Sequence, residues 1–325
     1  MYYQLEYSLK NAHNEGIWSC DWGEKYTMNT SSNRNTDQSD NNDEKTEETH
    51  QTDCIVTGSM DQSVKIWSYD STVPNLQLHH SLEGAIMAII SVVLNSDATI
   101  VASSSLDTNL YLWDTLTGTK LKTITTEPLE LWTLVFSPDD KYVLSGSHNG
   151  KIIAYNIQTG KHDYSFDTKG AFTMCVAYSP DGKYLACGSF NGFVYIFDVT
   201  TKRLVHTIRK GKLHIRSLCF SSDSKYLVTG SDEHVLHIYS VHNTTHLKSL
   251  NEHKSWILGL DFAPDCKTFA SCSADNTIKI WDVNTFSCIN TLRHHTDNVW
   301  SVKYNSIGDK MISVSDDNNI NVYSK

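Results

Sequence analysis

Fifteen histidines give this sequence a possible route to metal binding, because imidazole nitrogens are common ligands of transition metals. His234 and His237 are three residues apart, and His242 and His246 are four apart, which are spacings found in metal sites. On a strand, however, residues i and i+3 point to opposite faces, and no set of cysteines or carboxylates completes a ligand shell. We therefore expect neither a metal nor a cofactor.

Motifs for nucleophilic or phosphate chemistry are also missing from the sequence. It contains no Gly-x-Ser-x-Gly elbow, no glycine-rich phosphate loop and no paired-carboxylate context. The chain is not expected to be an enzyme.

The most regular feature is a hairpin over residues 271–283, which ends in Trp281-Asp282. Related hairpins end at equivalent aromatic residues throughout the chain, namely Trp67, Trp113, Tyr155, Phe197, Tyr239 and Tyr323. The first gap in this series is 46 residues and each later gap is 42. A fixed period of this size predicts repeated supersecondary units.

One repeat, residues 131–167, shows what each unit contains. Short segments rich in Val, Ile, Tyr and Phe are separated by Asp, Asn, Gly and Pro, which is typical of antiparallel strands. The predicted strands are residues 131–137, 142–147, 151–157 and 162–166. Four strands in about 42 residues is the size of a propeller blade.

The two ends of the chain indicate how the ring closes. The seventh hairpin finishes at Tyr323 and lacks a fourth strand, whereas residues 2–10 form an extra strand without a local partner. If the amino-terminal strand completes the last blade, two exposed sheet edges disappear. We predict an all-β fold, a single seven-bladed β-propeller domain over residues 1–325.

One insertion interrupts this pattern in the first blade. Residues 24–53 are rich in Asn, Ser, Thr, Asp and Glu and carry half of the net charge of −10. With almost no apolar residues, such a segment cannot bury enough surface to offset its ordering. We predict a disordered acidic insertion.

The hairpin ending in Trp-Asp resembles the repeat of the WD-repeat (WD40) propellers, over essentially the whole chain. That resemblance implies a structural tetrad of His, Ser or Thr, Asp and Trp in each blade. The tetrad residues that match are His13, Thr57, Asp61 and Trp67 in the first repeat, His253, Ser271, Asp275 and Trp281 in the sixth, and His295, Ser313 and Asp317 in the seventh. Repeats two to five have Ala85, Glu127, Lys169 and Gly211 in place of the histidine.

A narrower resemblance involves four longer stretches, residues 12–22, 103–107, 131–138 and 298–305. They are similar to the small WD-repeat subunit shared by the superkiller complex, which assists the RNA exosome in mRNA decay, and the polymerase-associated factor complex of transcription elongation. This resemblance implies a scaffold that binds segments of larger subunits. The implied partners are a helical-repeat subunit and an RNA helicase, or elongation-complex subunits, and the isolated chain is expected to be monomeric.

Two aligned columns predict the partner-binding rim, since propellers bind partners through loops at one mouth of the channel. One column lies 17 residues before the hairpin turn, corrected for the insertion in repeat one, and the other lies just before the turn. With two neighbouring aromatic residues, the predicted rim is Trp18, Met60, Leu106, Trp132, Phe172, Phe190, Arg216, Asp232, Trp256, Trp300 and Asp316. Exposed Trp and Arg are typical anchors of protein interfaces. We hypothesise that this face takes short linear segments, with a basic anchor near Asp232, Glu233 or Asp316; the alternative is that the tryptophans pack between blades.

Two other functions remain open. The net charge argues against a general nucleic-acid surface, and the only basic cluster flanks residues 204–208 and consists of Lys202, Arg203, Arg209, Lys210 and Lys212. Such charges on an outer strand are typical of a solvated edge, so direct nucleic-acid contact is not expected, although an RNA-contacting propeller is the main alternative. A substrate receptor of a ubiquitin ligase is a further one.

The expected location follows from the amino terminus and the cysteines. No basic flank followed by an apolar run begins the chain, and the longest apolar run, residues 85–94, is too short to span a bilayer. Eight single cysteines are typical of reduced, buried residues. We expect a cytoplasmic and nuclear protein without membrane contact.

Overall fold

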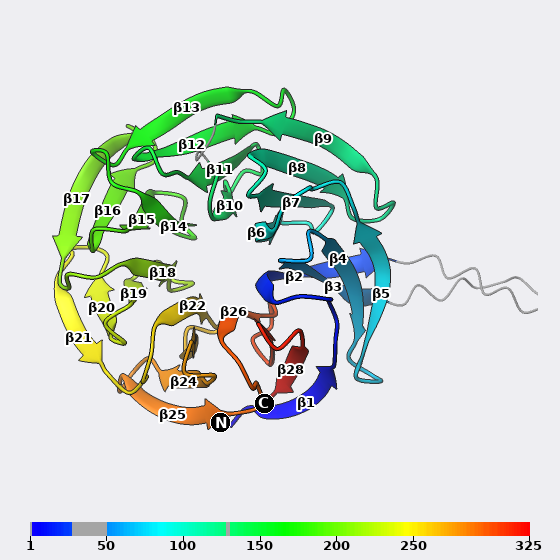
Figure 1. Cartoon of the computed structure of the whole chain (residues 1–325). Helices are drawn as coiled ribbons and strands as arrows, with labels where there is room; N and C mark the ends of the chain where they lie inside the picture. The colour runs from blue at the N-terminus through cyan, green and yellow to red at the C-terminus, as the bar shows by residue number, and fades with distance from the viewer. Residues whose placement is uncertain (1, 28–50, 128–130) are drawn as a thin grey trace, which may run out of the picture.

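Seven four-stranded antiparallel sheets form a closed ring around a central channel (Figure 1). The computed structural model describes residues 2–27, 51–127 and 131–325. Every regular element in that part of the chain is a strand, as expected for short segments rich in β-branched and aromatic residues. The predicted all-β, seven-bladed propeller is confirmed.

Each blade contributes one strand to each of four concentric positions. The innermost strands, in blades 1 to 7, are β2 (Ile17–Thr27), β6 (Ile89–Leu94), β10 (Leu134–Phe136), β14 (Thr173–Tyr178), β18 (Ile215–Phe220), β22 (Ile257–Phe262) and β26 (Val299–Tyr304). The second strands are β3 (Gln51–Ser59), β7 (Ile100–Ser105), β11 (Tyr142–Gly146), β15 (Tyr184–Ser189), β19 (Tyr226–Ser231), β23 (Thr268–Ser273) and β27 (Lys310–Ser315). The third strands are β4 (Val64–Asp70), β8 (Asn109–Asp114), β12 (Lys151–Asn156), β16 (Phe193–Asp198), β20 (Leu236–Ser240), β24 (Ile278–Asp282) and β28 (Ile320–Ser324). The outermost strands are β5 (Asn75–Leu82), β9 (Lys120–Thr125), β13 (His162–Asp167), β17 (Arg203–Arg209), β21 (His246–Leu250), β25 (Ser287–Leu292) and, in blade 7, β1 (Gln4–Leu9).

The inner strand of blade 3 is shorter than the sequence predicts. It begins at Leu134 rather than at residue 131, whereas the other three strands of this blade lie within a residue or so of their predicted bounds. The Trp132 amide donates its hydrogen bond to the Ser145 hydroxyl, at 3.0 Å, instead of to a strand neighbour. Trp132 is therefore not paired with a neighbouring strand and lies at the edge of the channel.

The amino-terminal strand closes the ring as predicted. Strand β1 pairs antiparallel with β28, and the two chain ends lie side by side in Figure 1. The Tyr3 hydroxyl donates to the Gly308 carbonyl at 2.8 Å, which ties the start of the chain to the β26–β27 turn. Blade 7 thus joins strands from both ends of the sequence.

The hydrophobic core lies between the blades rather than within a single centre. The buried apolar side chains form seven clusters, and each cluster joins two neighbouring blades. Trp281, for example, is fully buried in the cluster between blades 5 and 6. Burying a large aromatic side chain stabilises the fold by roughly 2–3 kcal/mol, so the seams supply most of its stability.

The predicted insertion begins and ends inside strands. Strand β2 continues to Thr27 and β3 starts at Gln51, with Tyr26 paired to Thr52. The prediction of disorder is therefore wrong for residues 24–27 and 51–53, which extend this strand pair. Residues 28–50, the rest of it, lie outside the described residues.

Candidate functional site

Hydrogen bonds connect the tetrad side chains of blade 1. The His13 imidazole bonds Asp61 through Nδ1 at 3.0 Å and the Thr57 hydroxyl through Nε2 at 2.8 Å. The Trp67 indole N–H donates to the same hydroxyl at 2.9 Å. These connected hydrogen bonds link the loop before the first strand, the second strand, the turn and the third strand of the blade.

Blades 6 and 7 repeat the arrangement. His253 bonds Asp275 and Ser271 at 2.9 and 2.7 Å, and His295 bonds Asp317 and Ser313 at the same two distances. Burial by itself would raise the pKa of each aspartate, but the histidine bond and backbone N–H groups outweigh it. The pKa of Asp317 falls to about 2 and those of Asp61 and Asp275 fall further. These carboxylates are charged structural anchors at neutral pH.

The blades without the histidine use other donors. In blade 2 the Tyr111 hydroxyl donates to Asp107 at 2.9 Å, and the Trp113 indole still reaches Ser103 at 3.2 Å. In blade 5 the Glu233 carboxylate accepts from the Lys212 amide at 2.7 Å. Each turn is held, but by a different set of bonds.

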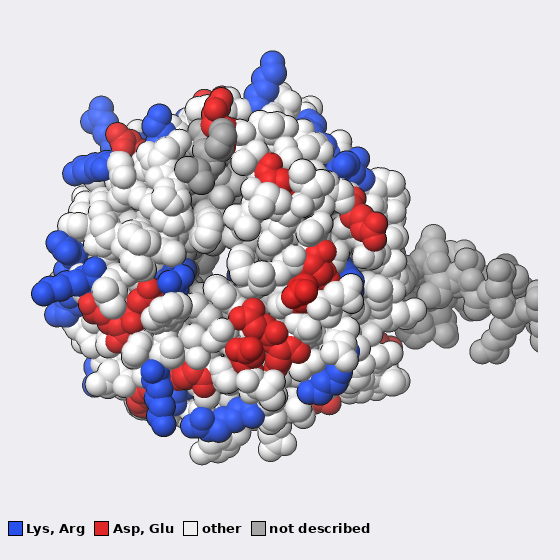
Figure 2. All heavy atoms as spheres, in the orientation of Figure 1, with Lys and Arg blue, Asp and Glu red and all other residues white. Residues whose placement is uncertain are grey.

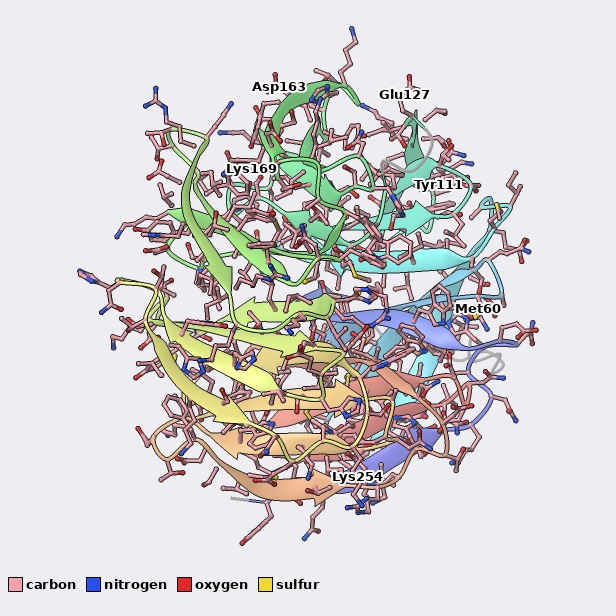
Figure 3. The ribbon with its side chains drawn as sticks, turned by 60° about the vertical axis from the view of Figure 1, so that its left-hand side comes forward. Met60, Tyr111, Glu127, Asp163, Lys169 and Lys254 are labelled. Carbon is pink, nitrogen blue, oxygen red and sulfur yellow. The ribbon has the colours of Figure 1, made fainter. Side chains whose placement is uncertain are left out.

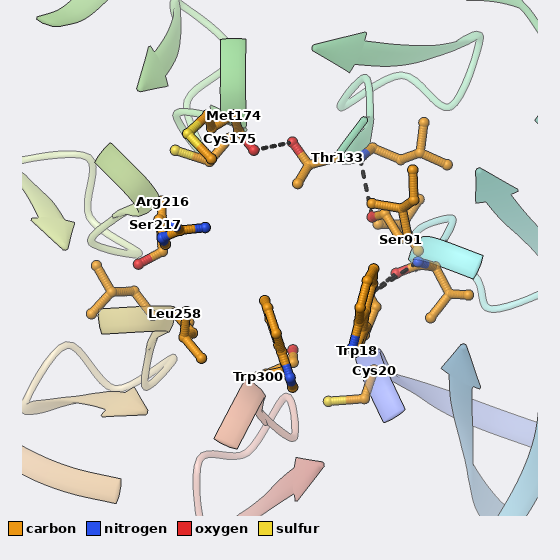
Figure 4. A pocket seen from close by; sticks show the side chains of 18 of the residues that line it. Trp18, Cys20, Ser91, Thr133, Met174, Cys175, Arg216, Ser217, Leu258 and Trp300 are labelled. Carbon is orange, nitrogen blue, oxygen red and sulfur yellow. Dashed lines mark hydrogen bonds between the residues drawn. The ribbon is translucent and has the colours of Figure 1, made fainter. Parts of the chain in front are cut away.

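One end of the central channel opens as a cavity of about 350 Å³ (Figure 4). All seven members of the first predicted column line it, one from each blade. They are Trp18, Ile90, Trp132, Met174, Arg216, Leu258 and Trp300. The structure therefore brings together, around one opening, residues that lie up to 282 positions apart in the sequence.

The channel tryptophans face the opening instead of filling the seams between blades. Trp18, Trp132 and Trp300 are half-buried, and the Trp18 and Trp300 rings lie 5.1 Å apart between their centroids. The indole N–H groups of Trp18 and Trp300 have no acceptor among the described residues. Both N–H groups are themselves buried, so the channel offers a partner the aromatic surface of the rings and not these donors.

The second column surrounds this opening, and its large apolar members are exposed. Met60 and Leu106 are each 41% exposed, Phe190 is 50% exposed, and the neighbouring Trp256 is 46% exposed. Met60 is labelled in Figure 3, on the turn between β3 and β4. Exposed side chains of this size contribute little to the core and are available for contact.

Aromatic rings form a continuous strip across blades 3 to 5. Between ring centroids, Trp132 lies edge-on to Phe172 at 5.3 Å and Phe172 lies 6.1 Å from Phe190. Phe190 stacks on His214, with 3.7 Å between the centroids. His148 stacks on Phe172 at 4.0 Å. We call these five residues the aromatic strip.

The hypothesis that a basic residue of a partner binds at Asp232 is wrong. Its side chain is only 5% exposed and is already paired inside the protein. Arg216 donates through Nε to one carboxylate oxygen and through Nη2 to the other at 3.1 Å, and His214 bonds the latter at 2.8 Å. Arg216 also lies 4.7 Å from the Trp256 ring. Because the charge of Asp232 is neutralised internally, it is not free to bind a basic residue of a partner.

Asp316 remains at the rim and bonds the Asn298 amide at 3.0 Å. Two further exposed residues at the mouth, Ile86 at 77% and Met87 at 47% exposure, lie outside both predicted columns. They lie in the loop between β5, the outer strand of blade 1, and β6, four and three positions before Ile90. In the sequence, the feature that could have identified them is a pair of adjacent apolar residues in a loop at this end of a blade.

The histidines with metal-like spacing in the sequence have other neighbours in the structure. His237 and His246, one from each sequence pair, lie 5.5 Å apart, and both bond the Ser249 hydroxyl at 2.9 Å. Burial and the neighbouring His246 lower the pKa of His237 to about 4. Among the described residues, no three His, Cys, Asp or Glu side chains are grouped as a metal would require.

Of the basic cluster, Lys202, Arg203 and Arg209 lie on or beside the outer strand β17, whereas Lys210 and Lys212 lie in the loop that leads to β18. Lys202 lies 3.6 Å from the Tyr164 ring and Arg209 lies 4.8 Å from the Phe193 ring. Lys202 and Arg209 therefore cover the protein's own aromatic side chains. As for membranes, the described part of the chain offers no helix of the length and apolarity that crossing would need.

Comparisons with known proteins give the same architecture. Residues 131–319, more than half of the chain, match the family model described as "Echinoderm microtubule-associated protein second beta-propeller". Residues 41–68 and 76–114 match the model of the WD domain, G-beta repeat.

Two curated relatives are WD-repeat proteins. The chain is 36% identical to the WD repeat-containing protein SL1-17 of Schistosoma mansoni over 140 residues, which is 43% of this chain and 38% of that protein. It is 28% identical to the WD repeat-containing protein VIP3 of Arabidopsis thaliana over 131 residues, 40% of this chain and 33% of that protein. The aligned part thus spans about a third of the length of each relative.

Proposed function

The chain belongs to the WD-repeat β-propeller family and matches the model of the second β-propeller of echinoderm microtubule-associated protein. From this we propose that it is a non-enzymatic scaffold that binds short linear segments of larger proteins. The bound segment lies across the channel mouth. Its apolar side chains contact Trp18, Trp132 and Trp300.

One observation carries this proposal: a residue from every blade converges on a single cavity at the mouth. An apolar opening rimmed by exposed Met, Leu, Phe and Trp is suited to a protein segment, because aromatic residues in partly enclosed sites are the usual binding hot spots.

We further propose that the larger proteins belong to the superkiller complex or to the polymerase-associated factor complex, in the cytoplasm and nucleus respectively. The support is the resemblance of four sequence stretches. Three of these stretches, residues 12–22, 131–138 and 298–305, contribute Trp18, Trp132 and Trp300 to the cavity. The fourth contributes Leu106 to the rim.

The test is affinity purification of the tagged full chain and of its Trp132→Ala/Trp300→Ala variant, with identification of the co-eluting proteins. The wild-type chain is expected to recover a helical-repeat scaffold with an RNA helicase, or elongation factors. The double variant is expected to lose them by at least about tenfold, since buried interface tryptophans are each worth roughly 2 kcal/mol or more. Its thermal midpoint should change little, because both side chains face the channel.

A matched control replaces exposed leucines on outer strands, Leu121→Ala and Leu247→Ala, which lie in β9 and β21. This control should retain its partners. Loss of folding in the tryptophan variant would mean that these residues belong to the core, and undiminished capture by a folded variant would refute the proposed site.

A further inference from the structure

The charged side chains of the mouth are unevenly distributed around the ring. In blades 7, 1 and 2 the mouth loops and turns carry seven carboxylates and two cations. These are Asp297, Asp316, Asp317, Glu15, Asp61, Glu83 and Asp107 against Arg293 and Lys10. In blades 4 and 5 the corresponding segments, with the channel residue Arg216, carry four cations and two carboxylates. These are Lys169, Lys210, Lys212 and Arg216 against Asp232 and Glu233.

On the acidic side, several carboxylates have no cationic partner. Asp61 and Asp317 belong to the histidine networks and Asp107 accepts from Tyr111. Glu15 and Asp297 are exposed, and neither forms an ion pair within residues 2–27, 51–127 and 131–325. Figure 2 shows acidic side chains gathered beside the channel over blades 7 and 1. This part of the mouth can accept positive charge.

On the other side, Asp232 is buried and paired, Glu233 is half-buried, and two lysine side chains form no ion pair among the described residues. Asp232 is paired with Arg216 and His214, and Glu233 accepts from the Lys212 backbone amide. Lys169 and Lys212 have exposed side chains, in the loops before β14 and β18, and Lys169 is labelled in Figure 3. Lys and Arg side chains also line the outer margin of blades 4 and 5 in Figure 2. This side can accept negative charge.

The centre between the two sides is close to neutral. Arg216 is the only ionised residue of the first column, and its charge is balanced by Asp232. The aromatic strip continues from the channel toward Lys169 and Lys212, because Phe172 precedes β14 and His214 precedes β18. An apolar stretch of a partner therefore leads from the channel to the basic side.

We propose that the partner segment is polarised in charge, with an acidic end over blades 4 and 5, an apolar centre in the channel and along the aromatic strip, and a basic end over blades 7 and 1. The proposal rests on the proposed function, since it specifies what the same mouth selects. Charges of this kind at a rim fix the orientation of a bound segment and steer its approach more than they add affinity. Such charges act over about 10 Å at 0.1 M salt.

The test begins with a random twelve-residue peptide library displayed on phage and selected against the folded full chain. Clones that also bind the Trp132→Ala/Trp300→Ala variant are discarded. A synthetic peptide from the strongest remaining clone is then measured on two charge-reversal variants, Lys169→Glu/Lys212→Glu and Glu15→Lys/Asp297→Lys. All four changes are at exposed side chains, and a circular-dichroism melt checks that both variants fold like the wild type.

We expect enriched peptides that carry acidic residues at one end and basic residues at the other. Each charge-reversal variant should raise the dissociation constant about tenfold at low salt, because two rim attractions become repulsions. Replacing the acidic residues of the peptide by Lys should restore binding to the Lys169→Glu/Lys212→Glu variant only. Replacing its basic residues by Glu should restore binding to the Glu15→Lys/Asp297→Lys variant only.

Enriched peptides of one charge sign, or equal affinity for the wild type and both reversal variants, would overturn the polarised segment while leaving the channel as the binding site. If no clone distinguishes the wild type from the tryptophan variant, the proposed function fails and the polarised segment fails with it.

Discussion

At the scale of single residues, the fold tolerates loss of a tetrad histidine when another donor reaches the same carboxylate. Blade 2 has Ala85 at the histidine position, and there the Tyr111 hydroxyl donates to Asp107 from the third strand. Asp107 also accepts from the Ile86 amide at 2.9 Å, so the loop before the inner strand stays attached to the turn. One hydroxyl on a neighbouring strand does part of the work of an imidazole.

Tyr111→Phe tests this replacement. The variant loses one hydrogen bond to a charged acceptor, and we expect the free energy of unfolding to fall by about 1–2 kcal/mol. Urea unfolding followed by tryptophan fluorescence measures the change. Tyr195→Phe is the control, since it occupies the equivalent position of blade 4 and its hydroxyl bonds no described residue. An equal loss in both variants would show that the Asp107 bond has no special role.

At the scale of elements, the strand that closes the ring is tied to both neighbouring blades by one carboxylate. Glu6 of β1 accepts from Lys310 of blade 7 at 2.7 and 2.8 Å and from the Tyr69 hydroxyl of blade 1 at 2.7 Å. The Lys310 ammonium is largely buried and lies 5.4 Å from the Tyr69 ring. Glu6 thus joins the first and last blades where the chain ends meet.

Glu6→Ala should lower the free energy of unfolding by about 2–3 kcal/mol, because it leaves a largely buried ammonium without its counter-charge. The measurement is the urea midpoint at constant slope. Lys141→Ala provides the comparison, as it removes an exposed ion pair with Asp139 that should be worth at most about 0.5 kcal/mol. A Glu6→Ala chain as stable as Lys141→Ala would show that pairing of β1 with β28 closes the ring unaided.

At the scale of the whole molecule, neighbouring blades are linked by small polar side chains around the channel. The Ser19 hydroxyl accepts from the Val92 amide at 3.0 Å, and the Ser91 hydroxyl accepts from the Leu134 amide at 3.1 Å. Blade 6 has Gly259 at this position, and a Cβ atom there would lie 2.7 Å from Cys272 Sγ and 2.9 Å from the Trp300 carbonyl oxygen. The backbone that carries Trp300 approaches blade 6 closely because this residue is glycine.

Gly259→Ala should therefore cost about 1–3 kcal/mol and also weaken peptide binding, since blade 7 must move to make room for the methyl group. Unfolding by urea and titration with the selected peptide give the two values. Ser217→Ala, at the same position of blade 5, is the matched control, because that hydroxyl has no partner among the described residues. Wild-type stability in Gly259→Ala would show that the seam between blades 6 and 7 is looser than the distances indicate.

The repeat fixes almost all of the architecture before any contact is known. A spacing of 42 residues, an alternation of short apolar strands with turns, an extra amino-terminal strand and a last repeat without its fourth strand are all visible in the sequence. They are sufficient for seven blades and for closure by β1. They also place Trp18, Trp132 and Trp300 in one column, which becomes one cavity because a ring brings equivalent positions of every blade to the same radius and height.

The tertiary structure alone decided which of those residues are free to act. Asp232 has the sequence position of a rim acid, yet Arg216, which precedes it by 16 residues on the adjoining strand, neutralises it, and His214 in the loop before that strand forms a further hydrogen bond to it. His237 meets His246 rather than His234, because strand pairing and not chain spacing sets the neighbours. A sequence pattern determines position along a strand, whereas charge and exposure depend on side chains that the closed sheets bring together from separate segments.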